Sequence, residues 1–260
     1  MKYQIGSDPE LFLVDPKTGK IVSAIGIIPG VKHNAYIPQN LPKGYGLQVD
    51  NILAEFNIPP ITLKEELINN INVMKHYIKE YLKQHNFNLD IHCAASANVP
   101  DDQLLHPDAL IFGCDPDFNT YSRRQNQSPT CENKNLRSAG CHFHIGYKNP
   151  NIEMNFKIIQ YLDTYLGIPS ILKDTDTSRR ALYGKAGALR MQPWGVEYRT
   201  LSGFFISNDE LLEFCYIQIQ KALKALESNT ILPEFQIVEH IINNNDTTLA
   251  KTIINQFNIL

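Results

Sequence analysis

The sequence predicts an α+β fold, because strand-like and helical patterns both occur along its 260 residues. Apolar residues recur at helical spacing, most clearly over 62–85. Three short segments instead carry ionisable residues one position apart, the period at which side chains of a β-strand share a face. The segments are GSDPELFLV, GCHFHIG and GVEYRTL, and their pairs are Asp8 and Glu10, His142 and His144, and Glu197 and Arg199.

Length and composition indicate a globular protein. The chain is long enough for one large domain, or at most two small ones, and we expect a single domain spanning 1–260. A net charge of −3 gives no basic field for nucleic acid or an anionic membrane. No apolar stretch approaches the ~20 residues of a membrane-spanning helix, and the N-terminus does not resemble a signal peptide. We therefore expect a cytoplasmic protein whose cysteines are reduced, since their odd number lacks CxxC spacing. They are Cys93, Cys114, Cys131, Cys141 and Cys215.

The first segment predicts a hairpin over 3–28. Residues 3–14 have strand character, and residues 15–20 are of types that favour turns. A return strand is expected over 21–28. Pro9 lies within the first strand. Because proline cannot donate a ladder hydrogen bond, it suggests an edge strand or a bulge.

Two further strand regions follow a loop expected over 29–46. They are predicted over 47–58 and 89–99. Asp50 and Glu55 lie an odd number of residues apart in the former. A regular strand would place these two carboxylates on opposite faces.

Helices are predicted over 62–85, 151–166 and 208–226, and one or two short helices over 234–258. The first begins with a capping box at Thr62-Leu63-Lys64-Glu65, and the third with one at Ser207-Asn208-Asp209-Glu210. The stripe of the first helix consists of Leu67, Ile71, Met74, Ile78 and Leu82. The polar stretch 113–140 is long for a connection and could form a lid or a binding loop.

The three polar pairs predict a site on one face of a sheet. Their apolar neighbours would point into a core on the other face, and these are Leu11, Phe143, Ile145, Val196 and Tyr198. A floor of carboxylate, imidazole and guanidinium suits divalent metal and phosphate, and it suits a hydrophobic core poorly. Each pair alone could also be a solvated surface pair. Cys141 would point away from the histidines, which weakens both a Cys/His zinc site and cysteine catalysis.

Basic residues gather near the third pair. Arginine binds phosphate and carboxylate in a bidentate manner. No P-loop and no GxGxxG motif occurs, so ATP would have to bind on a sheet through metal and arginine. The residues concerned are Arg179, Arg180, Arg190, Arg199 and Lys185.

The ordered segments resemble the phage-type carboxylate–amine ligases of the glutamine synthetase and glutamate–cysteine ligase superfamily. The similar segments are GSDPELFLV, DNILAEFNIPP, FGCDPDFNTY, RSAGCHFHIG and RRALYGKAGALRMQPWGVEYRTLSG, within residues 3–207. The resemblance implies a curved, largely antiparallel sheet with the site on its concave face. The helices around 62–85, 151–166 and 208–226 would pack on the convex face, and nucleotide and acceptor would enter from opposite ends.

The resemblance also implies roles for individual residues. Mg²⁺ or Mn²⁺ ligands would be Asp8, Glu10, Glu55, His142 and Glu197, with Asp50 a weaker candidate. ATP would contact Arg180, Arg190, Arg199, His144 and Lys185, with Arg179 an alternative to Arg180. Arg199, Arg190 and His144 would take part in catalysis.

The implied reaction joins a carboxylate to an amine through an acyl phosphate formed from ATP. The substrates would be small molecules or peptides, an oligomer is compatible with the resemblance, and a phage-encoded protein would act in the host cytoplasm. Three alternatives remain open. They are a Zn- or Mn-dependent hydrolase using the same residues, a related phosphotransferase, and a non-catalytic binding module.

Overall fold

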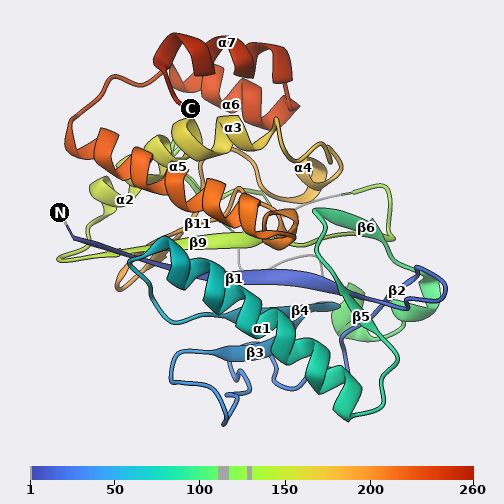
Figure 1. The fold of residues 1–260 in the computed structure, drawn as a ribbon. Helices are drawn as coiled ribbons and strands as arrows, with labels where there is room; N and C mark the ends of the chain where they lie inside the picture. The colour runs from blue at the N-terminus through green and yellow to red at the C-terminus, as the bar shows by residue number, and fades with distance from the viewer. Residues whose placement is uncertain (1, 111–116, 128–130) are drawn as a thin grey trace.

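An open, largely antiparallel sheet forms the centre of the protein. The computed structural model describes residues 2–110, 117–127 and 131–260. The strands of the main sheet follow the order β3-β4-β1-β9-β11-β10-β7, with β2 and β5 as further partners of β1, and β6 pairs separately with β8. Helices complete the structure (Figure 1). The predicted α+β class is therefore confirmed.

The strands have the following bounds: β1 Tyr3–Val14, β2 Ile21–Val22, β3 Gly46–Asp50, β4 Leu53–Asn57, β5 Asp90–His92, β6 Ser96–Asn98, β7 Phe118–Asn119, β8 Leu136–Ser138, β9 Cys141–Tyr147, β10 Ala188–Gln192 and β11 Gly195–Tyr198. The helices have these bounds: α1 Lys64–Gln84, α2 Ile152–Leu162, α3 Ile168–Ser170, α4 Arg179–Leu182, α5 Asp209–Glu227, α6 Phe235–Asn244 and α7 Thr247–Phe257. A π-helical turn over Asp163–Gly167 joins α2 to α3, and short 3₁₀ turns occur at Asp101–Gln103, Pro107–Leu110 and Gly203–Ile206.

Strand β1 lies inside the sheet, so the prediction of an edge strand at Pro9 is wrong. Pro9 faces Cys141 in the last pair of the β1–β9 ladder, one residue before the β1–β4 ladder begins at Glu10. Proline is tolerated here because the strand changes partners at this point. The return strand of the predicted hairpin is also shorter than expected, since only Ile21–Val22 pairs with β1.

The predicted strand over 47–58 is a hairpin. The chain turns at Asn51, whose φ is 55°, and β3 then pairs with β4 so that Gln48 lies opposite Glu55. Directly opposed residues share a face, as do residues two apart in one strand. Asp50 and Glu55 therefore lie on the same face, contrary to the prediction for a single strand.

The predicted strand over 89–99 is likewise divided. Its first part, β5, extends the sheet beside β1. Its second part, β6, pairs with β8 outside the main sheet.

Two helices begin one residue later than their predicted caps. The Glu66 carboxylate accepts hydrogen bonds from the backbone N–H groups of Thr62 at 2.9 Å and Leu63 at 3.0 Å, so α1 begins at Lys64. Asn208 caps α5 by accepting from the Leu211 N–H at 2.9 Å. Such caps satisfy N–H groups that have no partner inside the helix.

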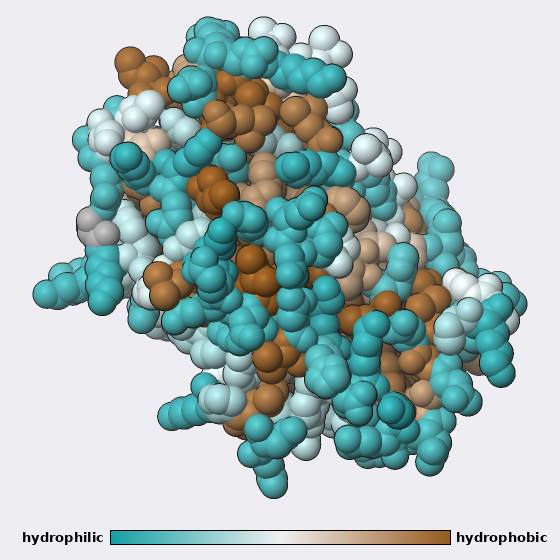
Figure 2. All heavy atoms as spheres, viewed as in Figure 1, coloured by the Kyte–Doolittle hydropathy of each residue, from teal (hydrophilic) through white to brown (hydrophobic). Residues whose placement is uncertain are grey.

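Helices cover one face of the central strands. Figure 1 shows α1 and α5 in front of the sheet, with α6 and α7 at the far end of the helical layer. The predicted stripe of α1 is entirely buried, and so are the five apolar residues expected beneath the polar pairs. In Figure 2 hydrophilic side chains cover much of this helical face, with apolar groups showing between them. The core therefore lies between the helices and one face of the sheet, and the polar pairs lie on the other face.

Within the described residues, the helices are too short or too polar to cross a membrane. Cys93, Cys131, Cys141 and Cys215 are free thiols, and Cys114 lies outside the described residues.

Truncation of the helical core should destabilise the protein. Ile71 is fully buried in α1, so Ile71→Ala should reduce the free energy of unfolding by roughly 2–5 kcal/mol. His76→Ala, at an exposed position of the same helix, should change it by less than about 0.5 kcal/mol. Urea denaturation measures both, and equal losses would contradict the described packing of α1.

Candidate active site

Strand register brings the predicted site residues together. Asp8 of β1 lies opposite His142 of β9, His144 lies opposite Glu197 of β11, and Glu10 lies opposite Glu55 of β4. Each pair joins neighbouring strands, and side chains at opposed positions share a face. Four strands, β1, β4, β9 and β11, thus contribute to one polar surface.

The first group of ligand atoms surrounds Asp8. Its carboxylate lies 3.0 Å from Nε2 of His144 and 3.4 Å from Nδ1 of His142, which is 3.5 Å from Glu197. One atom from each of Asp8, His144 and Glu197 lies within 4.8 Å of the others. Arg199 forms an ion pair with Glu197.

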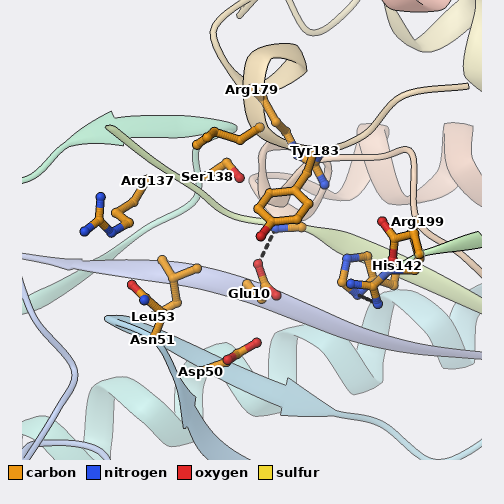
Figure 3. Close-up of a pocket in the computed structure, with 13 residues that line it drawn as sticks. Glu10, Asp50, Asn51, Leu53, Arg137, Ser138, His142, Arg179, Tyr183 and Arg199 are labelled. Carbon is orange, nitrogen blue, oxygen red and sulfur yellow. Dashed lines mark hydrogen bonds and ion pairs between the residues drawn. The ribbon is translucent and has the colours of Figure 1, made fainter. Parts of the chain in front are cut away.

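The second group combines Glu10, Asp50 and Glu55, whose ligand oxygens also lie within 4.8 Å of one another. The Gly140 N–H donates to Glu10 at 2.5 Å, and the Gln48 amide donates to Glu55 at 2.9 Å. Figure 3 shows Glu10 on β1 with Asp50 below it in the view. Of the predicted metal ligands, Asp8 and Glu197 thus belong to the first group, and Glu10 and Glu55 to the second, which also contains Asp50. His144, predicted to contact ATP, takes the place in the first group that was predicted for His142.

Electrostatics distinguish the two groups. In the first, burial disfavours the charged form of Asp8, but the two imidazoles outweigh burial and lower its pKa. Burial and Asp8 oppose ionisation of Glu197, yet Arg199 and His142 lower its pKa overall. In the second, burial raises the pKa of Glu10, and burial together with three neighbouring carboxylates raises that of Glu55.

Both groups fit a divalent cation. Three carboxylates with little compensating charge form an all-oxygen set, which suits Mg²⁺ or Mn²⁺. Two carboxylates and an imidazole suit Mn²⁺, and they suit Mg²⁺ where oxygen atoms dominate the remaining ligands. A cation would also relieve the repulsion that raises the pKa of Glu55.

A cavity opens beside the second group. It is lined by Glu10, Asp50 and His142 together with Tyr183 and basic residues (Figure 3). Its basic residues are Arg137, Arg179 and Arg199. An anionic group would therefore find both cations and hydrogen-bond donors here.

The structure separates Arg179 from Arg180. Arg179 lines this cavity, donates to the carbonyls of Ala139 and Leu201, and has a buried Nη1 without a hydrogen-bond partner among the described residues. Arg180 instead donates to the carbonyls of Gly184 and Thr200, and it does not line the cavity. Lys185 is exposed and likewise lies outside the lining. Of these three residues, Arg179 is the one in position to meet a ligand in this cavity.

Arg190 lies beside the first group. It faces Glu197 across the β10–β11 ladder, with Nη1 3.6 Å from its carboxylate. Within the described part of the chain, its buried Nε and Nη2 atoms make no hydrogen bond. These donors remain available to an anion.

The site geometry agrees with a comparison of the chain with protein families. Residues 134–237 match the model of a family described as phage phiEco32-like COOH·NH2 ligase-type 2. This match supports the assignment of the chain to the carboxylate–amine ligases. The match contains His142, His144, Glu197 and Arg199, and β1, β3 and β4 precede it. A search of curated proteins gave no significant match.

A buried residue on the helical side of the sheet supports the site. Asp163 accepts hydrogen bonds from the Tyr198 hydroxyl at 2.9 Å, the Tyr121 hydroxyl at 3.0 Å and the Gly187 N–H at 2.6 Å. Tyr198 lies between Glu197 and Arg199 in sequence. The hydrogen bond from Tyr198 to Asp163 therefore anchors, on the helical side of the sheet, the segment that carries both charged residues.

Asp117 is a second residue whose part the sequence pattern did not reveal. It forms an ion pair with Arg199 and lines the arginine-rich cavity. It belongs to the polar stretch predicted to include a lid, of which 113–116 and 128–130 lie outside the described residues. Asp117 follows a Cys-Asp-Pro segment in the sequence. No strand or helix period there could predict which way its side chain points.

Cysteine catalysis receives no support from the geometry. Cys141 is buried on the helical side of β9, as its alternation with His142 predicted. Burial raises the pKa of its thiol to about 12. A thiol in this state is a poor nucleophile.

Removal of the Asp163 carboxyl should change the pH dependence of stability. Burial raises its pKa from 3.8 to about 7, against the opposing hydrogen bonds of Tyr198 and Tyr121. Because the folded state then holds this proton to higher pH than the unfolded state, the group's contribution to stability declines as pH rises between these values. The unfolding free energy of the wild type should therefore fall over this range relative to that of Asp163→Asn, as measured by urea denaturation.

A matched exposed change serves as the control. Asp102 is exposed, so Asp102→Asn should give a pH profile parallel to that of the wild type. Parallel profiles for Asp163→Asn and the wild type would contradict the described environment of Asp163.

Proposed function

We propose that the protein is an ATP- and Mg²⁺-dependent ligase that joins a carboxylate to an amine through an acyl phosphate. The principal support is the meeting of two carboxylate-rich groups, Asp8/His144/Glu197 and Glu10/Asp50/Glu55, on one sheet face. The family match supports the reaction class. Dependence on ATP and Mg²⁺ is part of the proposal.

The reaction needs activation because a carboxylate has no good leaving group. In the proposed first step, a carboxylate oxygen attacks the γ-phosphorus of ATP, and the bond to the β–γ bridging oxygen breaks, which releases ADP. In the second step, the amine attacks the acyl carbon, the C–O bond to phosphate breaks, and phosphate and one proton are released. Phosphoryl transfer of this kind depends on alignment and on charge neutralisation.

The two ligand groups would hold the metal. When bound there, Mg²⁺ would supply positive charge against the phosphate oxygens. Asp8, His144 and Glu197 would hold one ion, and Glu10, Asp50 and Glu55 a second. His142 lies between Asp8 and Glu197 and would orient their carboxylates.

The arginines would stabilise the charge on the transferring phosphoryl group. Arg190 has buried donors adjacent to Glu197, and Arg199 is held between Glu197 and Asp117. Donors that are fixed before the reaction stabilise developing charge at little cost of reorganisation. Arg180 contacts backbone carbonyls and Lys185 is exposed, so we assign them no direct contact with ATP.

The activity should require Glu197. We expect ADP and phosphate release from Mg-ATP in the presence of mixed amino acids or peptides, and a loss of at least about 100-fold in Glu197→Gln, since an anchoring charge is removed. Coupled assays of ADP and of free phosphate measure the reaction. Glu210→Gln, an exposed change in α5, should retain full activity.

Other outcomes would distinguish the alternatives. Unchanged turnover in Glu197→Gln would contradict its role. ADP without free phosphate would indicate a phosphotransferase, and zinc-dependent hydrolysis without a response to nucleotide would indicate a hydrolase. Failure to bind millimolar Mg-ATP would indicate a non-catalytic module.

Metal binding should offset repulsion among the buried carboxylates. In EDTA, Glu55→Gln should have a higher Tm than the wild type, because it removes one of three crowded charges. Added Mg²⁺ should raise the Tm of the wild type more than that of Glu55→Gln, because metal stabilises the state that binds it. Scanning calorimetry measures both, and an equal Mg²⁺ effect in the two proteins would exclude Glu55 as a ligand.

A further inference from the structure

A second cavity adjoins the acidic groups on the side of β1 that bears Asp8. Its volume is about 380 Å³, which is within the range of small-molecule sites. Its lining consists of Gln4, Gly6, Asp8, Gln48, Glu55, Asn57, Ile58, Pro60, His144, Gly146 and Trp194. Two cavities with different linings therefore adjoin the acidic groups.

The lining changes character along the cavity. Asp8, His144 and Glu55 lie where it meets the proposed metal sites, whereas Trp194, Ile58 and Pro60 provide apolar surface. Unlike the arginine-rich cavity, it has no lysine or arginine among its described lining residues. A ligand with an uncharged flat part and an anionic part that reaches the metal fits this change.

Trp194 supplies the aromatic surface. It lies in the turn between β10 and β11, and its carbonyl accepts a hydrogen bond from the Tyr147 N–H at 3.1 Å. Its ring is 5.0 Å from that of His144, at an interplanar angle of 39°. The residue is 39% exposed, so part of its ring is accessible to a ligand that enters the cavity.

Glycines keep the adjacent floor of the cavity flat. Gly6 and Gly146 line it without side chains, and a Cβ atom at Gly6 would approach Nδ1 of His144 to 3.3 Å. Gln4 and Asp8 lie four residues apart in β1, a separation of roughly 13 Å at the usual strand rise. This length suits an extended nucleotide. The Gln4 amide could meet the edge of a base, and so could the second N–H of the Asn57 amide, whose Nδ2 also donates to the Gly44 carbonyl at 3.1 Å.

We propose that Trp194 is the stacking platform for the nucleobase of the nucleotide substrate, in the cavity lined by Gln4, Gly6, Asn57 and Gly146. This inference rests on the proposed function, since it places the phosphates toward Asp8 and His144. Stacking on an aromatic ring tolerates different bases. The amides of Gln4 and Asn57 would then favour particular base edges.

The chain provides a direct probe of this contact, because Trp194 is its single tryptophan. We expect Mg-ATP to change the intrinsic tryptophan fluorescence at saturation. Inorganic tripolyphosphate with Mg²⁺ carries the phosphates without a base, and it should bind with little change. A nucleotide that binds by calorimetry without altering the fluorescence would overturn the inference and leave the proposed function standing.

Affinity measurements provide a second, independent test. Trp194→Ala should weaken Mg-ATP binding about 10- to 100-fold, the usual loss for removing a stacked ring, and should leave tripolyphosphate binding within about twofold. Trp194→Phe retains a ring and should weaken Mg-ATP binding by no more than about threefold. Phe235→Ala removes another exposed aromatic residue, outside the cavity lining, and should have no effect.

The results also separate this inference from the proposed function. Equal ATP affinity in Trp194→Ala and the wild type would overturn the stacking role. Equal losses of ATP and tripolyphosphate affinity would do the same, because they would indicate a disturbed phosphate site. Absence of Mg-ATP binding in the wild type would reject the proposed function and this inference together.

Discussion

The site depends on closely spaced carboxylates that the central strands hold on one face of the sheet. The β4-β1-β9-β11 register places Glu10 beside Glu55, Asp8 beside His142, and His144 beside Glu197. Since side chains alternate along each strand, the same register sends Leu11, Phe143 and Tyr198 into the core. Shifting any of these strands by one residue would expose the core and bury the charges. Hydrophobic packing on one face therefore specifies the charge arrangement on the other.

Burial of like charges is costly, and the two acidic groups offset this cost differently. Around Asp8 and Glu197, imidazole and guanidinium groups keep the carboxylates ionised. Burial and neighbouring carboxylates raise the pKa of Glu55. A bound cation would counter this repulsion. The hydrogen bond between Asp163 and Tyr198 of β11 fixes this strand from the helical side of the sheet. A scaffold that holds repelling groups together in this way is typical of a functional site, where local stability is given up for preorganised charge.

Much of this arrangement could be predicted from the sequence, because it follows from strand and helix periods. The alternation in β1, β9 and β11 correctly predicted which side chains enter the core, and the stripe of α1 was confirmed in full. The β3–β4 turn was missed because Ile52 and Leu53 continue an apolar run, so Asp50 was placed on the wrong face. Arg179 and Arg180 are adjacent on a four-residue helix, too short for a period to assign their directions. Trp194 and Asp163 belong to no repeating pattern, and only the fold brings them to the site. The proposed roles in catalysis and metal binding stay predictions.

The most direct test of the central claim is a crystal structure with Mn²⁺ and a non-hydrolysable ATP analogue, examined for anomalous scattering. We expect two manganese peaks, one within coordination distance of Asp8 and Glu197 and the other within that distance of Glu10 and Glu55. Absence of manganese at both groups, with the analogue bound elsewhere, would contradict this expectation.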